Sequence, residues 1–353
     1  MSPSALSSPK SHCSSPNNVN QAGVPGASKN TFSTGDNMNQ SSRFAVRATS
    51  VAVFLAMGTA AYAAPNVDAN IELDSTYNSG SQLGSAGTGM SQSGRLELNV
   101  SQKAGTDYFV AGRATLLAKK DGSAGTDDLW VQLGSASADV KLGRFEAADL
   151  FPIAQDTVVN HAGNVYGTNL LRGRSEKFHA ALSVNGGSTL KFELGLIDAT
   201  DAALGTGAKG VRPVVMFSSG AFGFKVGAES GQYGVSGNKI EGMGFTGNYS
   251  ANGMAVNLNY AQGKQDAAAD NKMTSMAING QVGAFALGFV SAKNDQTGGD
   301  KQVQTVHASY SIPLFGVAGA SITPAISHST LKDSVLGTNQ DVDAFRVRLH
   351  YDF

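Results

Sequence analysis

The last nine residues of the sequence alternate strictly between large apolar and polar side chains. The apolar set is Phe345, Val347, Leu349, Tyr351 and Phe353. The polar set between them is Arg346, Arg348, His350 and Asp352. A period of two predicts a β-strand with one apolar and one charged face. In a soluble sheet the charged face meets water, whereas in a membrane barrel the apolar face meets lipid and the charged face meets a wet lumen.

The same alternation recurs through residues 64–353. Clear examples are the segments 95–100, 178–184, 190–196, 222–227 and 254–260. No segment shows a sustained period of 3.6, which a helix would require. The polar faces carry Arg, Glu, Lys, Asn and Gly, so they supply few side chains for a dry core. This pattern favours a barrel with a wet interior over a soluble sandwich.

The connections between these segments alternate between tight and long. The tight connections are rich in Gly and Asn and comprise residues 185–188, 218–221, 250–253 and 282–284. The long connections comprise residues 79–89, 119–127, 198–210, 262–272, 293–301 and 329–341. Tight periplasmic turns and long extracellular loops are typical of outer-membrane barrels.

Counting hairpins predicts an all-β transmembrane antiparallel barrel of sixteen strands, with both ends on the periplasmic side; counts of fourteen and eighteen remain open. The predicted strands are residues 66–78, 92–102, 106–118, 128–135, 138–145, 177–185, 188–198, 210–218, 221–230, 239–250, 254–262, 272–282, 284–293, 302–312, 315–328 and 342–353.

The first 63 residues differ from the rest of the chain. Residues 1–37 are rich in Ser, Asn, Gly and Pro and predict a disordered leader or an over-extended start. Residues 38–63 combine a basic segment, an apolar segment and the sequence Ala61-Tyr62-Ala63, which is typical of a secretory signal peptide. A single short membrane anchor is the alternative. After removal of the predicted signal peptide, residues 64–353 would form the barrel domain of a protein of the Gram-negative outer membrane.

Composition narrows the possible functions. Residues 1–63 hold four of the 26 Lys and Arg residues and one of the 27 Asp and Glu residues, so the remainder carries a net charge of about −4. This charge argues against nucleic acid as a partner. The single cysteine, Cys13, lies in the leader, so residues 64–353 contain no disulfide. No phosphate-binding loop or metal-ligand spacing occurs, so we expect neither a cofactor nor an enzyme.

The alternation fails for about thirty residues after Phe145. This segment, 146–176, follows the predicted fifth strand and is therefore the third external loop. Irregular loops of this length usually have a function. The apolar residues Leu150, Phe151 and Ile153 would be costly in free water, so we expect the loop to pack against the inner wall of the barrel.

Taken together, the export signal, the alternating hairpins, the long third loop after Gly143-Arg144 and the terminal Tyr351-Asp352-Phe353 resemble the trimeric general porins of Gram-negative outer membranes. The resemblance covers residues 64–353. It implies a homotrimer in outer-membrane lipid, a passive channel for ions and small hydrophilic solutes, and a third loop that narrows the pore. It also implies that Phe353 is an assembly signal for the outer-membrane assembly machinery.

In this family, acidic residues of the third loop face arginines on the opposite wall. Carried onto this chain, the acidic side comprises Glu146, Asp149 and Asp156. The basic side comprises Arg95, Arg113, Arg144, Arg172 and Arg174. The chain has Leu150-Phe-Pro-Ile153 where many members carry Pro-Glu-Phe-Gly-Gly. Opposed charges across a narrow waist would order water and set ion preference. Arg346 and Arg348 are further candidates for lumen residues.

Other functions remain possible for a barrel of this kind. A channel selective for a sugar or another small solute would line its path with aromatic side chains, for which Phe109, Trp130 and Tyr166 are the candidates. An adhesin or structural barrel would have a smaller lumen or larger exposed loops.

Overall fold

The computed structural model describes residues 64–79, 88–119, 121–153, 171–173, 178–198, 208–233, 238–266, 271–334 and 337–353. They belong to one compact unit, Ala61–Phe353. The predicted leader and signal peptide lie outside the described residues.

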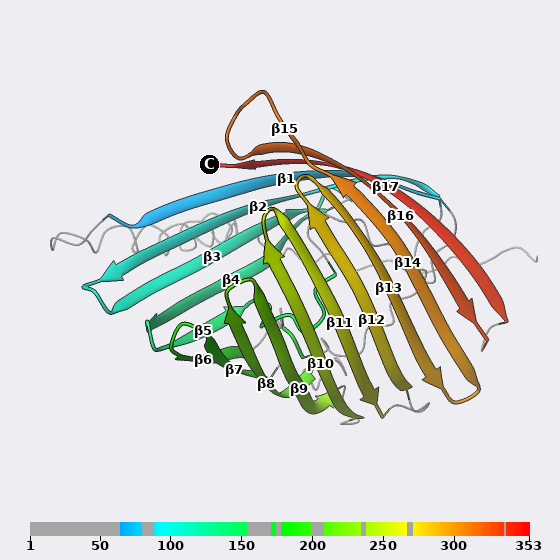
Figure 1. Ribbon diagram of the computed structural model, residues 1–353, viewed down its shortest axis with the longest axis horizontal. Helices are drawn as coiled ribbons and strands as arrows, with labels where there is room; N and C mark the ends of the chain where they lie inside the picture. The colour runs from blue at the N-terminus through cyan, green and yellow to red at the C-terminus, as the bar shows by residue number, and fades with distance from the viewer. Residues whose placement is uncertain are drawn as a thin grey trace, which may run out of the picture. The chain divides into compact units, whose positions relative to one another are not determined.

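The described residues form one antiparallel sheet that closes on itself (Figure 1). Its strands are β1 (Asn66–Ser79), β2 (Gly89–Ala104), β3 (Tyr108–Ala118), β4 (Ala124–Ser135), β5 (Ala138–Arg144), β6 (Phe178–Gly186), β7 (Leu190–Asp198), β8 (Ala208–Ser219), β9 (Phe222–Tyr233), β10 (Asn238–Ala251), β11 (Met254–Gln265), β12 (Asn271–Val282), β13 (Phe285–Gln296), β14 (Gly299–Tyr310), β15 (Ile312–Pro313), β16 (Ala320–Asp333) and β17 (Thr338–Asp352).

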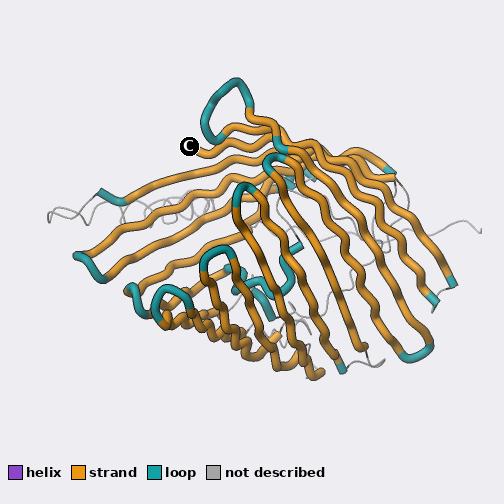
Figure 2. Tube along the Cα trace, in the orientation of Figure 1, coloured by secondary structure: helices purple, strands orange, loops and turns teal. Residues whose placement is uncertain are grey.

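Closure comes from β1, which pairs with β2 on one side and with β17 on the other. The two-residue β15 pairs only with β16, and β14 also pairs directly with β16, so β15 adds no strand to the ring. The barrel wall in the described part of the chain therefore has sixteen strands, and the predicted sixteen-stranded antiparallel barrel is confirmed. Among these residues, no helix is long and apolar enough to cross a membrane (Figure 2).

The period-two pattern places apolar side chains on the outer face of the barrel. On β17, Phe345, Leu349 and Tyr351 are 40–44% exposed, whereas the inward Arg346 is 9% exposed. The outward positions of the other strands repeat this pattern, with Leu, Val, Ile, Phe, Met and Tyr exposed around the barrel. In a closed barrel the backbone hydrogen bonds are satisfied between neighbouring strands, and the apolar outer belt faces the hydrocarbon of the membrane.

Three connections predicted as long are shorter in the structure. The prediction of residues 119–127, 293–301 and 329–341 as loops is wrong in part, because β4 begins at Ala124 and the strands β13, β14, β16 and β17 extend into the other two segments. Their polar composition resembles a loop, but the backbone pairs beyond the apolar belt. Ser334 and Asp300 continue this pairing, since the Ser334 N–H donates to the Asp300 carbonyl at 2.9 Å.

The opposite error occurs at the connection after β14. The sequence predicts a tight turn and a strand over residues 315–328, whereas β16 spans Ala320–Asp333. Residues 311–319 instead form a longer excursion that includes β15. The apolar composition of this excursion resembles a strand, which explains the shifted prediction.

Candidate pore constriction and lumen wall

The first part of the third loop lies on the inner wall of the barrel (Figure 2). It leaves β5 at Arg144, and the Ala148 N–H donates to Glu193 Oε1 on β7 at 2.8 Å. Further along, Thr246 Oγ1 on β10 donates to the Leu150 carbonyl at 3.2 Å. Residues 146–153 therefore run across the wall from β7 towards β12, as the predicted packing of this loop requires.

The same stretch ends at a carbonyl held by two asparagines. Asn259 Nδ2 on β11 donates to the Pro152 carbonyl at 2.7 Å, and Asn279 Nδ2 on β12 donates to the same oxygen at 3.0 Å. Asn257 Nδ2 in turn donates to Asn279 Oδ1 at 2.9 Å. Inward asparagines thus replace the water that a loop carbonyl would otherwise bind.

Two apolar side chains anchor the loop beside these hydrogen bonds. Leu150 is fully buried, and a Cβ on Gly227 of β9 would lie 2.9 Å from its Cδ1 atom, so the missing side chain leaves room for it. Phe151 is 4% exposed and packs against the small residues Ala261, Ala277 and Val290. The wall under the loop is therefore built from small inward residues, which the sequence reasoning did not use as a signal.

Near the loop's end, Leu171 and Gly173 hold the returning chain. The Leu171 N–H donates to Glu229 Oε2 at 3.1 Å, and Leu171 is 1% exposed. Glu146 and Gly173 form a β-bridge. Gly173 has φ of +132°, and a Cβ there would lie 2.2 Å from the Phe145 carbonyl, so only glycine fits.

A buried ion pair joins both ends of the loop to the wall. Arg212 Nε on β8 lies 3.6 Å from Glu229 Oε2 on β9, and both side chains are at most 1% exposed. Arg212 Nη1 also donates to the Ala148 carbonyl at 2.6 Å. Because Glu229 accepts from Leu171, the pair holds the outgoing and the returning chain together. Sequence reasoning missed both residues, because the two partners lie on different strands and meet only after folding.

The acidic residues of the loop pair within the loop itself. Arg172 Nη2 lies 3.0 Å from Glu146 Oε2, and Arg172 Nη1 lies 3.3 Å from Asp149 Oδ2. Asp149 Oδ1 also accepts the Phe151 N–H at 2.8 Å. The structure thus brings Arg172 to the acidic side of the lumen. The other two predicted residues of the loop, Asp156 and Arg174, lie outside the described residues.

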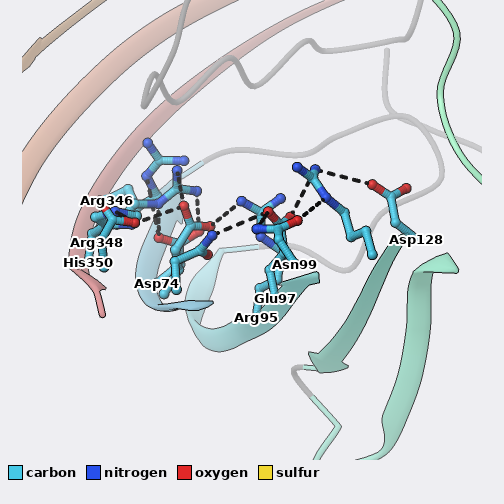
Figure 3. Close-up of polar contacts among 12 residues, drawn as sticks. Asp74, Arg95, Glu97, Asn99, Asp128, Arg346, Arg348 and His350 are labelled. Atoms are coloured by element: carbon cyan, nitrogen blue, oxygen red, sulfur yellow. Dashed lines mark hydrogen bonds and ion pairs between the residues drawn. The ribbon is translucent and has the colours of Figure 1, made fainter. Parts of the chain in front are cut away.

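Arg95 meets carboxylates on another part of the inner wall (Figure 3), and so does Arg113 of the neighbouring strand. Arg95 Nη2 on β2 lies 3.3 Å from Glu72 Oε2 on β1. Arg113 Nη1 on β3 lies 3.2 Å from Glu97 Oε2 and 3.6 Å from Asp128 Oδ2. Its Nε also donates to Asn99 Oδ1 at 2.8 Å. Arg144 differs, since its Nε donates to the Asp127 carbonyl at 2.7 Å at the root of the loop.

These paired charges continue onto β17, the strand that closes the barrel by pairing with β1 (Figure 3). Arg348 donates from Nε and Nη2 to the two carboxylate oxygens of Asp74 on β1, at 2.7 and 2.8 Å. Arg346 Nε lies 3.9 Å from Asp74, and His350 Nδ1 lies 3.3 Å from Glu72. Four arginines thus interleave with four carboxylates, and we call this set the charge ladder: Arg346, Arg348, Arg95, Arg113, Glu72, Asp74, Glu97 and Asp128.

The charge ladder and the loop occupy opposite sides of the barrel. In a ring of sixteen strands, β1 and β9 are eight places apart. The ladder spans β17 to β4 through β1, whereas the loop contacts β6 to β13. The carboxylates of the ladder were not predicted, although they occupy inward positions of alternating segments. Among the described residues, no cluster of three or more His, Cys, Asp or Glu side chains could hold a metal ion.

Comparisons with known proteins agree with this architecture. No family model matches the sequence, and no curated protein matches it. Solved structures align over 82% of the chain and nearly all of their own length. The trimer form of OmpT, an outer membrane protein of Vibrio cholerae, aligns with a TM-score of 0.61 and 11% sequence identity over 100% of its chain. A loop-deletion mutant of OmpT aligns with a TM-score of 0.63 and 11% identity, also over 100% of its chain. An anion-selective porin from Comamonas acidovorans aligns with 0.59 at 14% identity over 99% of its chain. A triple mutant of a Rhodopseudomonas blastica porin aligns with 0.54 at 15% over 100%.

At these identities the likeness concerns the fold, which is the porin-like sixteen-stranded outer-membrane barrel. The apolar outer belt and the closed ring of antiparallel strands place the chain in a membrane, and barrels of this architecture belong to the Gram-negative outer membrane. The chain is therefore an outer-membrane β-barrel protein.

Proposed function

We propose that this barrel is a passive diffusion channel for ions and small hydrophilic solutes, narrowed by the third loop. The observation that carries the proposal is the attachment of residues 146–153 to the inner wall opposite the charge ladder. A loop held against the wall this way narrows a channel, and its polar groups are satisfied by hydrogen bonds to the wall. Inward charges on the facing side keep the passage wet.

The charge ladder favours weak ion preference. Its four arginines are balanced by its four carboxylates, and the arginine–carboxylate distances run from 2.7 to 3.9 Å. Paired charges this close cancel much of each other's field at a distance. We therefore propose a modest selectivity that depends on the residues of the loop.

A channel selective for a particular small solute, such as a sugar, is the second candidate. It is favoured by Trp130, an inward aromatic on β4 with Lys141 Nζ 4.4 Å and Arg113 Cζ 5.6 Å from its ring centroid. An aromatic face flanked by cations could stack on a sugar ring while the cations bind its hydroxyls. Phe109 is also inward on β3, whereas Tyr166 lies outside the described residues.

Single-channel recording in planar bilayers distinguishes the two candidates. The general channel should give a large ohmic conductance that neutral sugars and amino acids reduce only through their effect on bulk conductivity. Saturable block by one sugar, relieved in the Trp130→Ala variant, would instead establish the selective channel. No conductance from a correctly folded barrel would contradict both and favour a structural or adhesive role.

The same proposal includes a homotrimer assembled by the outer-membrane assembly machinery, and no enzymatic activity. The trimer is supported by the trimer form of OmpT, which shares the fold. Native mass spectrometry of the detergent-solubilised protein gives the mass of the assembly. A monomer mass at all concentrations would remove the trimer from the proposal without affecting the channel.

A further inference from the structure

The connection between β14 and β16 differs in composition from the other short turns. Residues 312–320 read Ile-Pro-Leu-Phe-Gly-Val-Ala-Gly-Ala and contain no polar side chain. The turns 105–107, 136–137 and 252–253 carry Thr, Asp, Ser or Asn together with small residues, and the turns 220–221 and 283–284 are Gly-Ala, so none of these turns has a large apolar side chain. Turns in contact with water favour such polar residues. The large side chains Leu314, Phe315 and Val317 at this connection therefore favour an apolar environment.

Backbone hydrogen bonds fix the shape of the excursion. The Leu314 N–H donates to the Ala320 carbonyl at 2.9 Å, and the Val317 N–H donates to the Leu314 carbonyl at 2.9 Å. Phe315 lies at the tip with φ of +53°, a conformation that a bulky residue rarely adopts, and is 95% exposed. An ordered turn that presents an aromatic side chain in this way is built to contact something apolar.

Beneath the excursion is a groove of about 400 Å³ on the outer face of the barrel. Leu314 and Val317 of the excursion form one side of it. The other side is the barrel wall, with the outward residues Ile71 and Leu73 of β1 and Leu349 and Tyr351 of β17. His350 also borders the groove, but its ring nitrogen faces Glu72. The groove is thus lined by hydrocarbon and aromatic groups.

We propose that this groove binds one acyl chain of a phospholipid in the periplasmic leaflet. The wall residues of the groove are part of the lipid-facing belt, so a hydrocarbon chain can enter it from the bilayer without crossing water. The excursion with β15 lies at the end of the barrel where the tight turns and the C-terminus are found (Figure 1), which is the periplasmic end of such barrels, and its residues line the groove. No lysine or arginine is among the residues that line it, so the site recognises the chain and not the headgroup.

Brominated lipids test the contact directly. The sequence has a single tryptophan, Trp130, which faces the lumen, so the unmodified protein gives the baseline emission. In vesicles of phosphatidylcholine brominated along the acyl chain, Phe315→Trp should add an emission that is blue-shifted and strongly quenched. Tyr108→Trp, on the open belt at the same end, is the matched control. Red-shifted emission quenched by iodide would show that the turn is in water and would overturn the proposal.

If neither bromine nor iodide quenches the emission added by Phe315→Trp, the proposal is also overturned, because a second protein chain would then cover the groove.

A second measurement tests retention of the lipid. Native mass spectrometry of protein extracted in mild detergent should detect a bound phospholipid that is lost in Ala320→Phe, which fills the groove. Ala114→Phe adds the same bulk on the outer face of β3 and should leave binding unchanged. Equal retention in both variants would contradict the assignment.

Discussion

Arg348 and Asp74 form a bidentate ion pair between β17 and β1, the last and first strands of the barrel. The pair occupies directly opposed positions in the β17–β1 register. Its hydrogen bonds of 2.7 and 2.8 Å match the geometry by which a guanidinium binds both oxygens of a carboxylate. The same two side chains thus reinforce the β17–β1 pairing that closes the barrel and contribute charge to its lumen.

Replacing Arg348 with Met should therefore affect both stability and selectivity. Loss of two charge-assisted hydrogen bonds costs about 1.5–3 kcal/mol in stability, and the lumen becomes more negative by one charge. In gel mobility assays we expect the folded form to convert to the unfolded form at a lower temperature. In bilayer recordings we expect the reversal potential to shift towards cation preference. Arg348→Lys retains the charge, so it should lower the unfolding temperature without shifting the reversal potential. An unchanged reversal potential in Arg348→Met would show that the ladder lies away from the ion path.

The buried pair Arg212–Glu229 should control how firmly the loop is held. Arg212→Met leaves Glu229 buried without its cation, which costs about 3–5 kcal/mol. The loop root loses the bond to the Ala148 carbonyl as well, so we expect larger and noisier single-channel currents. The double variant Arg212→Met/Glu229→Gln removes the orphaned charge and should recover stability while the noise persists. Quiet currents of normal size in both variants would mean that other contacts suffice to hold the loop.

Two asparagines share the Pro152 carbonyl, which predicts a redundant contact. Asn259→Ala or Asn279→Ala alone leaves one donor and should change conductance little. The double variant leaves the carbonyl without its two protein donors, which costs about 1–3 kcal/mol, and should increase conductance by loosening residues 150–153. Strictly additive effects of the two single variants would argue against shared binding of this oxygen.

Asp149 provides a test of the loop's contribution to ion preference. Asp149→Asn removes a negative charge from the loop, while Arg172 keeps its contact with Glu146. We expect a reversal potential shifted towards anions, opposite in sign to the shift in Arg348→Met. Asp121→Asn, which changes a carboxylate in the exposed β3–β4 connection, is the control and should leave selectivity unchanged. Equal shifts in the two aspartate variants would indicate a general surface-charge effect.

The terminal residue Phe353 should matter for assembly. Its N–H donates to the Ala69 carbonyl, and its carbonyl accepts from the Ala69 N–H, both at 2.8 Å, so it completes the pairing of the last strand with β1. Its ring stacks on Tyr351 with centroids 5.4 Å apart. Deleting Phe353 should lower the amount of folded protein in the outer membrane, whereas Phe353→Tyr should preserve it. Normal levels of the truncated protein would refute a role in assembly.

Much of the barrel could be predicted from local pattern. Alternation along a strand decides which side chains face lipid, and this is why Phe345 and Arg346 were assigned to the correct faces. The length of the third loop and its apolar residues Leu150 and Phe151 likewise predicted that it packs on the wall. Strand ends were less accurate where pairing continues beyond the belt, as at Asp300 and Ser334, because polar strands and loops have similar compositions there.

The sequence by itself determined the β period, the order of hairpins and the inward placement of Arg95, Arg113, Arg346 and Arg348. Only the tertiary structure decided which charges meet, because ring closure brings Asp74 beside Arg348 across 274 residues of chain. It likewise placed Arg172 with the loop's own acids and joined Arg212 to Glu229 under the loop. These contacts depend on strand register and on the curvature of the whole ring, and no short segment of sequence specifies either.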